Sequence, residues 1–166
     1  WNGYSITDER KEQVNFTDPY LDNEQVVVTM ADSGITSLDD LAGKVVAAQI
    51  NSSAVEAMDA NPEISDTFAD RPVFDTNDMA IMDMEAGRSD AVVADKVLLD
   101  YVISHKDDPS QYMILGEGFG SEEYAVGVRK EDTQLLAALN QVLDEMKEDG
   151  TAAQISEKWF GADIVK

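Results

Sequence analysis

The chain has 166 residues, 34 acids against 12 bases, a formal net charge of -22, one histidine and no cysteine. This length predicts one domain or two small ones, because domains hold roughly 100–200 residues. The charge argues against a nucleic-acid partner, which needs clustered Lys and Arg, and against an anionic membrane surface. Without cysteine there is no thiolate site, and one histidine excludes a multi-histidine metal site. No metal or cofactor is therefore expected.

Helix and strand signals alternate at short intervals, which favours an α/β fold. β-branched and alternating runs predict strands over residues 26–30, 44–49, 71–74, 90–95, 112–115 and 123–129. Capping residues and helical spacing predict helices over residues 38–41, 54–59, 78–86, 97–102, 132–149 and 152–160. Thr7 can begin a further short helix, Asn77 is the expected cap of the third, and Thr151 of the last.

Three glycines, Gly116, Gly118 and Gly120, are expected to lie in a loop. Ser121 stands where G-x-G-x-x-G has its last glycine, and no helix signal follows, so a dinucleotide site is not favoured. The sequence also holds no G-x-S-x-G, no Walker A loop and no H-E-x-x-H. These absences argue against the common enzyme classes.

Three features are typical of binding chemistry. Arg10 carries a guanidinium fork that suits a carboxylate, although an internal ion pair is an equally good explanation. The strand-to-helix turn Gln49-Ile50-Asn51-Ser52-Ser53 offers amide and hydroxyl donors to an anion, or simply caps a helix. Asp95 ends an apolar strand, where it can accept an ammonium group or cap the next helix. Together the three would supply what a free amino acid requires.

An ordered series of segments spans almost the whole chain: residues 3–10 (GYSITDER), 14–20 (VNFTDPY), 37–44 (SLDDLAGK), 86–95 (AGRSDAVVAD), 124–130 (YAVGVRK), 149–151 (DGT) and 158–161 (KWFG). This series resembles the polar amino-acid family of periplasmic-type solute-binding proteins of ABC importers. The resemblance implies the type II periplasmic-binding-protein fold, in which two α/β lobes joined by two hinge strands close on one amino acid.

The resemblance also implies roles for single residues. Arg10 would bind the ligand carboxylate, and Asp95 would accept the ligand ammonium. Further ligand contacts would come from residues 3–10 and from the turn: Gly3, Ser5, Gln49, Asn51, Ser52 and Ser53. In the turn, Asn51 replaces the family's usual glycine.

The resemblance divides the chain into one complete lobe and part of the other. Residues 1–25 would form part of lobe one and the first hinge strand, residues 26–122 lobe two, and residues 123–166 the second hinge strand and the C-terminal helices of lobe one. The opening segments of lobe one, with their aromatic ligand contacts, are missing. The chain alone is therefore expected to bind ligand weakly or not at all. It is also expected to self-associate through an apolar stripe of Leu135, Leu139, Val142 and Met146.

The function implied is that of an extracytoplasmic receptor, not an enzyme, which captures a free amino acid and delivers it to the permease of an ABC importer. It would work in the periplasm or as a cell-surface lipoprotein, with its signal peptide outside this chain. The alternatives are an amino-acid sensor domain of a signalling receptor and, less favoured, a dehydratase-type enzyme on the same fold.

Overall fold

The computed structural model describes residues 3–166, which divide into two units. The second unit is the continuous segment Glu24–Gly120, whereas the first combines the residues up to Asn23 with Ser121–Lys166. Two strands, β2 (Leu21–Met30) and β6 (Tyr112–Tyr124), each supply residues to both units. The expected boundaries after residues 25 and 122 are those between the lobes of the full-length protein, and they stay a prediction.

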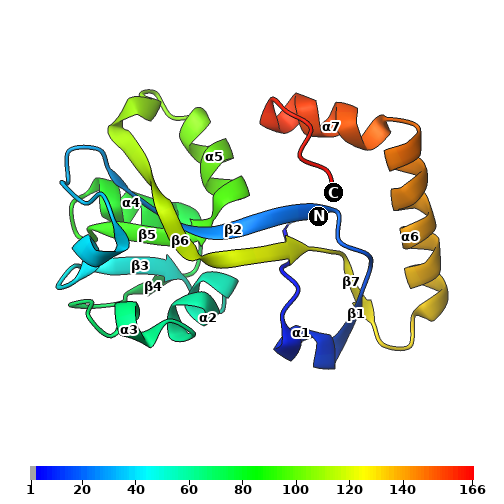
Figure 1. The fold of residues 1–166 in the computed structure, drawn as a ribbon, viewed down its shortest axis with the longest axis horizontal. Helices are drawn as coiled ribbons and strands as arrows, with labels where there is room; N and C mark the ends of the chain where they lie inside the picture. The colour runs from blue at the N-terminus through cyan, green and yellow to red at the C-terminus, as the bar shows by residue number, and fades with distance from the viewer. Residues whose placement is uncertain (1–2) are drawn as a thin grey trace. The chain divides into compact units, whose positions relative to one another are not determined.

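The second unit is built on a five-stranded sheet with the order β4-β3-β5-β2-β6. Its central strand, β5 (Ala91–Asp95), runs parallel to β3 (Val46–Gln49) and antiparallel to β2, and β4 (Val73–Phe74) is an edge strand. Helices lie on both sides of this sheet (Figure 1): α2 (Ser53–Asp59), α3 (Pro62–Ser65), α4 (Asn77–Glu85) and α5 (Lys96–Ser104). Two short 3-10 helices, Leu38–Leu41 and Pro109–Gln111, complete the unit.

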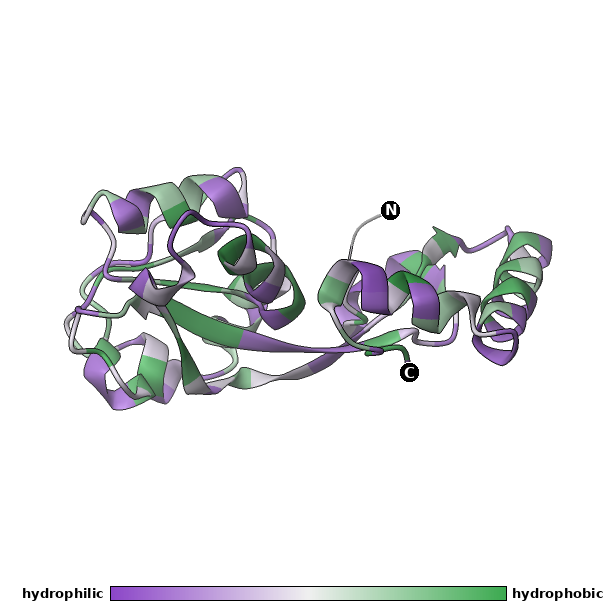
Figure 2. Cartoon of the chain, turned by 90° about the horizontal axis from the view of Figure 1, so that it is seen from above, coloured by the Kyte–Doolittle hydropathy of each residue, from purple (hydrophilic) through white to green (hydrophobic). Residues whose placement is uncertain are grey.

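The sheet is buried on both faces, which explains the continuous apolar runs of β2 and β5. Val27 faces one core cluster with Met58, and its neighbour Val28 faces the other with Met84 and Leu99. Leu99 is fully buried. Figure 2 shows the strands of this unit coloured mostly as hydrophobic.

The first unit has a smaller sheet and less buried apolar surface. β1 (Val14–Phe16) pairs antiparallel with β7 (Gly127–Arg129), next to α1 (Asp8–Gln13), α6 (Thr133–Glu148) and α7 (Thr151–Phe160). No residue of α6 is buried against the rest of the described chain. Figure 2 shows hydrophobic residues along both α6 and α7. The large exposed apolar side chains of this unit are Leu135, Val142, Ile155, Trp159, Phe160 and Ile164. The expected self-association through Leu135, Leu139, Val142 and Met146 stays a prediction.

The three glycines expected in a loop lie inside a strand instead, because β6 runs without interruption through residues 116–120. For Gly118 the reason is close contact between backbones. A Cβ at position 118 would overlap the carbonyl oxygen of Gln25 in the neighbouring strand β2. Here glycine serves strand packing and does not mark a turn.

Two helices begin differently from the prediction. Thr76, not Asn77, caps α4, since the Thr76 side chain accepts a hydrogen bond from the Met79 amide at 3.2 Å. Gly150 precedes α7 with a φ of 79°, and Thr151 is its first helical residue. Among the described residues, none of the helices combines the length and the apolar character needed to cross a membrane.

A polar cluster joins the end of α4, the segment after α5 and the start of β6. The Tyr112 hydroxyl donates to Oε1 of Glu85, and the Lys106 ammonium lies 2.7 Å from the same oxygen. Burial raises the pKa of Glu85, but the bonds from Lys106 and Tyr112 outweigh it and hold that pKa below its usual value. Burial, followed by the bond to Glu85, raises the pKa of Tyr112 to about 12.

This cluster predicts a loss of stability at both ends of the pH range. Glu85 has a lower pKa in the folded state, so its contribution is present above pH 4.5 and is lost as the pH falls below it. Tyr112 has a higher folded pKa, so its contribution is lost between pH 10.0 and about 12. We expect Glu85→Gln to flatten the acid decline in melting temperature, and Tyr112→Phe the alkaline decline. Equal slopes in the wild type and both variants, measured by circular dichroism, would contradict this.

The buried sheet predicts a second effect, a difference between two leucines. Leu99→Ala removes a fully buried side chain from the core and should cost about 2–5 kcal/mol. Leu135→Ala, at a position that is 50% exposed on α6, should change stability by less than about 0.5 kcal/mol. Native-state hydrogen exchange of the β5 and α6 amides measures both changes. A loss for Leu99→Ala as small as that for Leu135→Ala would refute the core assignment.

Candidate functional site

Arg10 is held by contacts within the first unit. The Arg10 amide donates to the Thr7 hydroxyl at 3.3 Å, which fixes the start of α1 as predicted. Its Nη1 donates to the Ser5 carbonyl oxygen at 3.0 Å, and its guanidinium carbon lies 4.7 Å from the centre of the Tyr4 ring. One edge and one face of the guanidinium are thus occupied by protein groups. These contacts fix the direction of the fork, as a site for a planar carboxylate requires.

Ser5 is almost fully buried and is part of the same local structure. It forms an isolated β-bridge with Tyr124, and its hydroxyl donates to Oε1 of Glu122 at 2.6 Å. The same oxygen accepts a bond of 2.7 Å from the Asn23 amide. Gly3 lies so near the Tyr124 ring that a Cβ there would be 2.5 Å from two ring carbons. Gly3 and Ser5 thus fit the chain against β6 and orient the Arg10 contact.

The predicted turn lies between β3 and α2 in the second unit. Asn51 adopts a φ of 56°, the left-handed conformation that glycine adopts readily, and Asn is among the few other residues that tolerate it. Asn51 therefore adopts a backbone conformation for which glycine is the usual residue. The Gln49 side chain donates to the Asp75 carbonyl oxygen at 3.0 Å and accepts from Asn77 at 3.1 Å, which ties β3 to the start of α4.

The two serines of this turn differ in their contacts. Ser52 occupies the N-cap position of α2, but its hydroxyl donates to the Gln49 carbonyl oxygen at 2.7 Å and makes no capping bond. Ser53 is the first helical residue and is buried, and its hydroxyl accepts a bond of 3.0 Å from Nε2 of Gln25. Ser52 therefore tightens the turn, while Ser53 belongs to a larger polar cluster.

Asp95 belongs to the same cluster. It ends β5 and occupies the N-cap position of α5. Its Oδ1 accepts a hydrogen bond from Nε2 of Gln25, which stands opposite Asp95 in the register of β2 and β5. Both interpretations of Asp95, as a helix cap and as an ammonium acceptor, stay predictions. Gln25 brings Asp95 together with Ser53, whereas Gln49 and Ser52 are held by their own local contacts.

Sequence reasoning missed three residues of these two arrangements: Tyr4, Gln25 and Glu122. Gln25 has a signal that could have been used, because it is a polar residue directly before a run of three valines. Tyr4 lies inside the segment of residues 3–10 that resembles the family. Nothing local marks Glu122, which is one of 34 acids.

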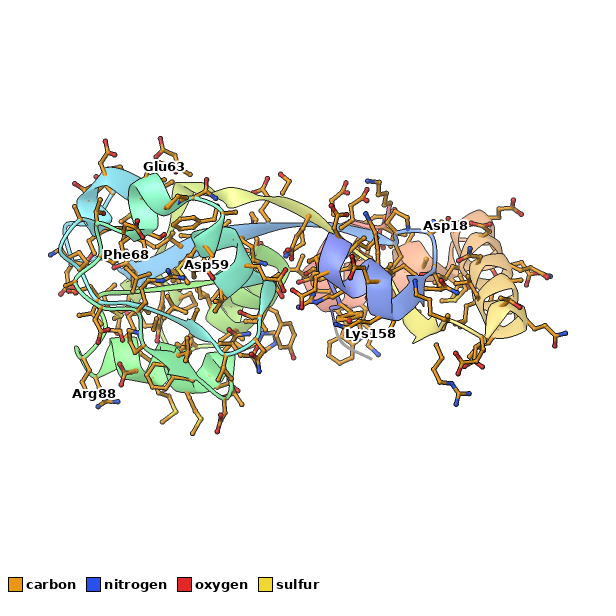
Figure 3. All side chains as sticks on the ribbon, turned by 90° about the horizontal axis from the view of Figure 1, so that it is seen from below. Asp18, Asp59, Glu63, Phe68, Arg88 and Lys158 are labelled. Carbon is orange, nitrogen blue, oxygen red and sulfur yellow. The ribbon has the colours of Figure 1, made fainter. Side chains whose placement is uncertain are left out.

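The segment AGRSD is structural in this protein. The Ser89 hydroxyl donates to Asp83 at 2.6 Å, and the bond holds the pKa of Asp83 below its usual value. Arg88 also contacts Asp83, at 2.5 Å, and Figure 3 shows Arg88 at the outside of the second unit. Asp90 accepts a bond of 2.8 Å from the Val45 amide. Together these bonds align α4, β5 and β3. Over residues 3–166, no group of three or more His, Asp or Glu side chains could hold a metal ion.

Known proteins are similar to this chain over almost its whole length. The family model of bacterial extracellular solute-binding proteins, family 3, matches residues 1–162. The L-cystine-binding protein of Escherichia coli strain K12 is 34% identical over 168 residues, which cover 99% of this chain and 60% of that protein. The arginine-binding extracellular protein of Bacillus subtilis strain 168 is 31% identical over 160 residues, covering 96% and 61%. The chain thus spans about 60% of the length of the curated relatives it matches.

A solved structure agrees. The substrate binding protein of an ABC uptake transporter from Streptococcus pneumoniae, with bound histidine, matches with a TM-score of 0.92 and 38% identity. The match covers 100% of this chain and 69% of that chain. The predicted type II α/β fold is confirmed.

The left-handed turn at Asn51 predicts a contrast between two substitutions. Asn51→Gly should leave the turn intact, because glycine adopts this φ without strain. Asn51→Val should cost about 1–2 kcal/mol, because a side chain branched at Cβ is strained there. Thermal unfolding of the two variants provides the measurement, with Asn51→Gly as the matched control for loss of the amide. A Val variant as stable as the Gly variant would show that the conformation is not required.

Proposed function

Since the chain belongs to family 3 of the bacterial extracellular solute-binding proteins, we propose that the full-length protein binds a free amino acid and delivers it to the permease of an ABC importer. The family's description supports a location outside the cytoplasm. We further propose that a signal peptide directs the protein either to the periplasm or to the cell surface as a lipoprotein. The names of similar proteins supply the first ligands to test, which are L-cystine, arginine and histidine.

The observation that carries this proposal is the fixed guanidinium of Arg10. Arg10 is half-buried, and its guanidinium contacts a backbone carbonyl oxygen and an aromatic face. A guanidinium oriented in this way binds a carboxylate more selectively than a mobile lysine does. We assign it to the α-carboxylate of the amino acid.

Asp95 supports the second half of the proposal. Its carboxylate stands at the carboxyl end of a central strand and is oriented by Gln25. Ligands of α/β proteins gather at such strand ends. We assign Asp95 to the α-ammonium, and we assign supporting contacts to the ligand carboxylate to Ser52 and Ser53 at the start of α2.

Four other predicted residues have indirect roles in this proposal. Gly3 and Ser5 keep the Arg10 contact in place through Tyr124 and Glu122. Gln49 and Asn51 shape the turn before α2. The similar proteins are named for binding or transport, and that supports a receptor over the dehydratase-type enzyme.

Calorimetry on the full-length protein tests the proposal. We expect one of L-cystine, L-arginine, L-histidine or another free amino acid to bind. Arg10→Ala and Asp95→Asn should each weaken binding by about 2–5 kcal/mol, because each leaves a ligand charge without its partner. Arg10→Lys should recover only part of the loss, since an ammonium cannot form the bidentate contact.

Matched controls make the same charge changes elsewhere. Arg71→Ala removes a guanidinium paired with Asp59, and Asp66→Asn neutralises an exposed acid at the end of α3. Neither should change the affinity. The proposal fails if no free amino acid binds, or if Arg10→Ala and Asp95→Asn bind as tightly as these controls.

A further inference from the structure

Gln25 is an almost fully buried polar residue at the end of the pairing between β2 and β5. It is 2% exposed, and β2 places it directly before the three valines of the core. Burying an amide is costly unless it is hydrogen-bonded, so such a residue needs a reason to be there. Nε2 donates to two acceptors, Oδ1 of Asp95 and Oγ of Ser53 at 3.0 Å. One amide group therefore contacts both of the groups assigned above to opposite ends of the ligand.

We infer that Gln25 is a positioning residue for amino-acid binding. Its amide sets the direction of the Asp95 carboxylate toward the ligand ammonium and couples it to Ser53 at the start of α2. The inference rests on the proposed function, and it adds a residue that acts through others. Gln25 itself need not touch the ligand.

The position of Gln25 is fixed from two sides. In β5, Asp95 is its partner in the antiparallel register. In β6, Gly118 approaches so closely that any Cβ would overlap the Gln25 carbonyl oxygen. The backbone at residue 25 therefore has little room to move, and a fixed backbone sends the side chain to the same two acceptors. Gly118 of β6 and the side-chain amide of Gln25 in β2 thus act together to orient Asp95.

This role has a consequence that a purely structural role lacks. When Gln25 holds the Asp95 carboxylate in one orientation, the site should bind a ligand with an ammonium more tightly than the same molecule without one. Losing the Gln25 amide should lower affinity for the amino acid while sparing the analogue. General damage to the fold would weaken both ligands in the same proportion.

The test is calorimetry on the full-length protein with two matched ligand pairs. L-arginine is compared with 5-guanidinopentanoate, and L-histidine with 3-(imidazol-4-yl)propanoate, each analogue lacking only the ammonium. The variants are Gln25→Leu, which removes the donor at similar volume, and Gln25→Asn, which keeps an amide that is one methylene shorter. Gln154→Leu, at an exposed position of α7, is the control.

We expect Gln25→Leu to weaken binding of the amino acid about 10-fold or more, as loss of a hydrogen bond to a charged group does. Binding of the analogue should change by less than about 3-fold. Combined with Asp95→Asn, Gln25→Leu should cost almost nothing further, since its effect passes through Asp95. Equal losses for both members of a pair, or fully additive losses in the double variant, overturn the inference.

Failure of the proposed function looks different. If the wild type binds no free amino acid, or Asp95→Asn binds as tightly as the wild type, the proposed function fails. The contact is then decided by nuclear magnetic resonance of the ¹⁵N-labelled protein. The side-chain amide signal of Gln25, assigned by its loss in Gln25→Leu, should move in Asp95→Asn and in Ser53→Ala. If it moves in neither variant, Gln25 does not position these groups.

Discussion

The antiparallel pairing of β2 with β5 is the constraint on which the second unit depends. It sets Val27 opposite Val93 and Gln25 opposite Asp95 in one register. Side chains alternate along a strand, so a slip by one residue would exchange the valines of β2 between the two core clusters and move Gln25 away from Asp95. The apolar core and the polar cluster are thus specified by the same set of backbone hydrogen bonds. Selection for one therefore maintains the other.

Because the chain is so acidic, the polar groups that several contacts hold in place are the informative ones. With 34 acids against 12 bases, most carboxylates face water, and single ion pairs at the surface contribute little. The groups that matter are those whose direction is set by several contacts. Glu122 accepts from both Ser5 and Asn23, and Asp95 accepts from Gln25. The guanidinium of Arg10 is oriented in the same manner, by a carbonyl oxygen and a ring.

Much of the fold could be predicted because its signals are local. The valine run of β2, the apolar run of β5, the Thr7 cap and the long helix α6 all follow from spacing within a few residues. The continuity of β6 could not be predicted, since Gly118 is explained by the Gln25 backbone in another strand. The candidate site divides in the same way. Arg10 and Asp95 stand in recognisable motifs, but the bond from Ser5 to Glu122 spans 117 residues and that from Gln25 to Asp95 spans 70. No local pattern carries such information.

The order of the two units along the chain has a consequence for synthesis. Glu24–Gly120 is continuous, whereas the first unit needs both the residues up to Asn23 and Ser121–Lys166. During translation, the second unit can close its sheet as soon as β6 has emerged, and domains generally fold as units in order of synthesis. The N-terminal segment with Arg10 must then wait for β7, which pairs with β1. The part of the chain that holds Asp95 can therefore be complete before the part that holds Arg10.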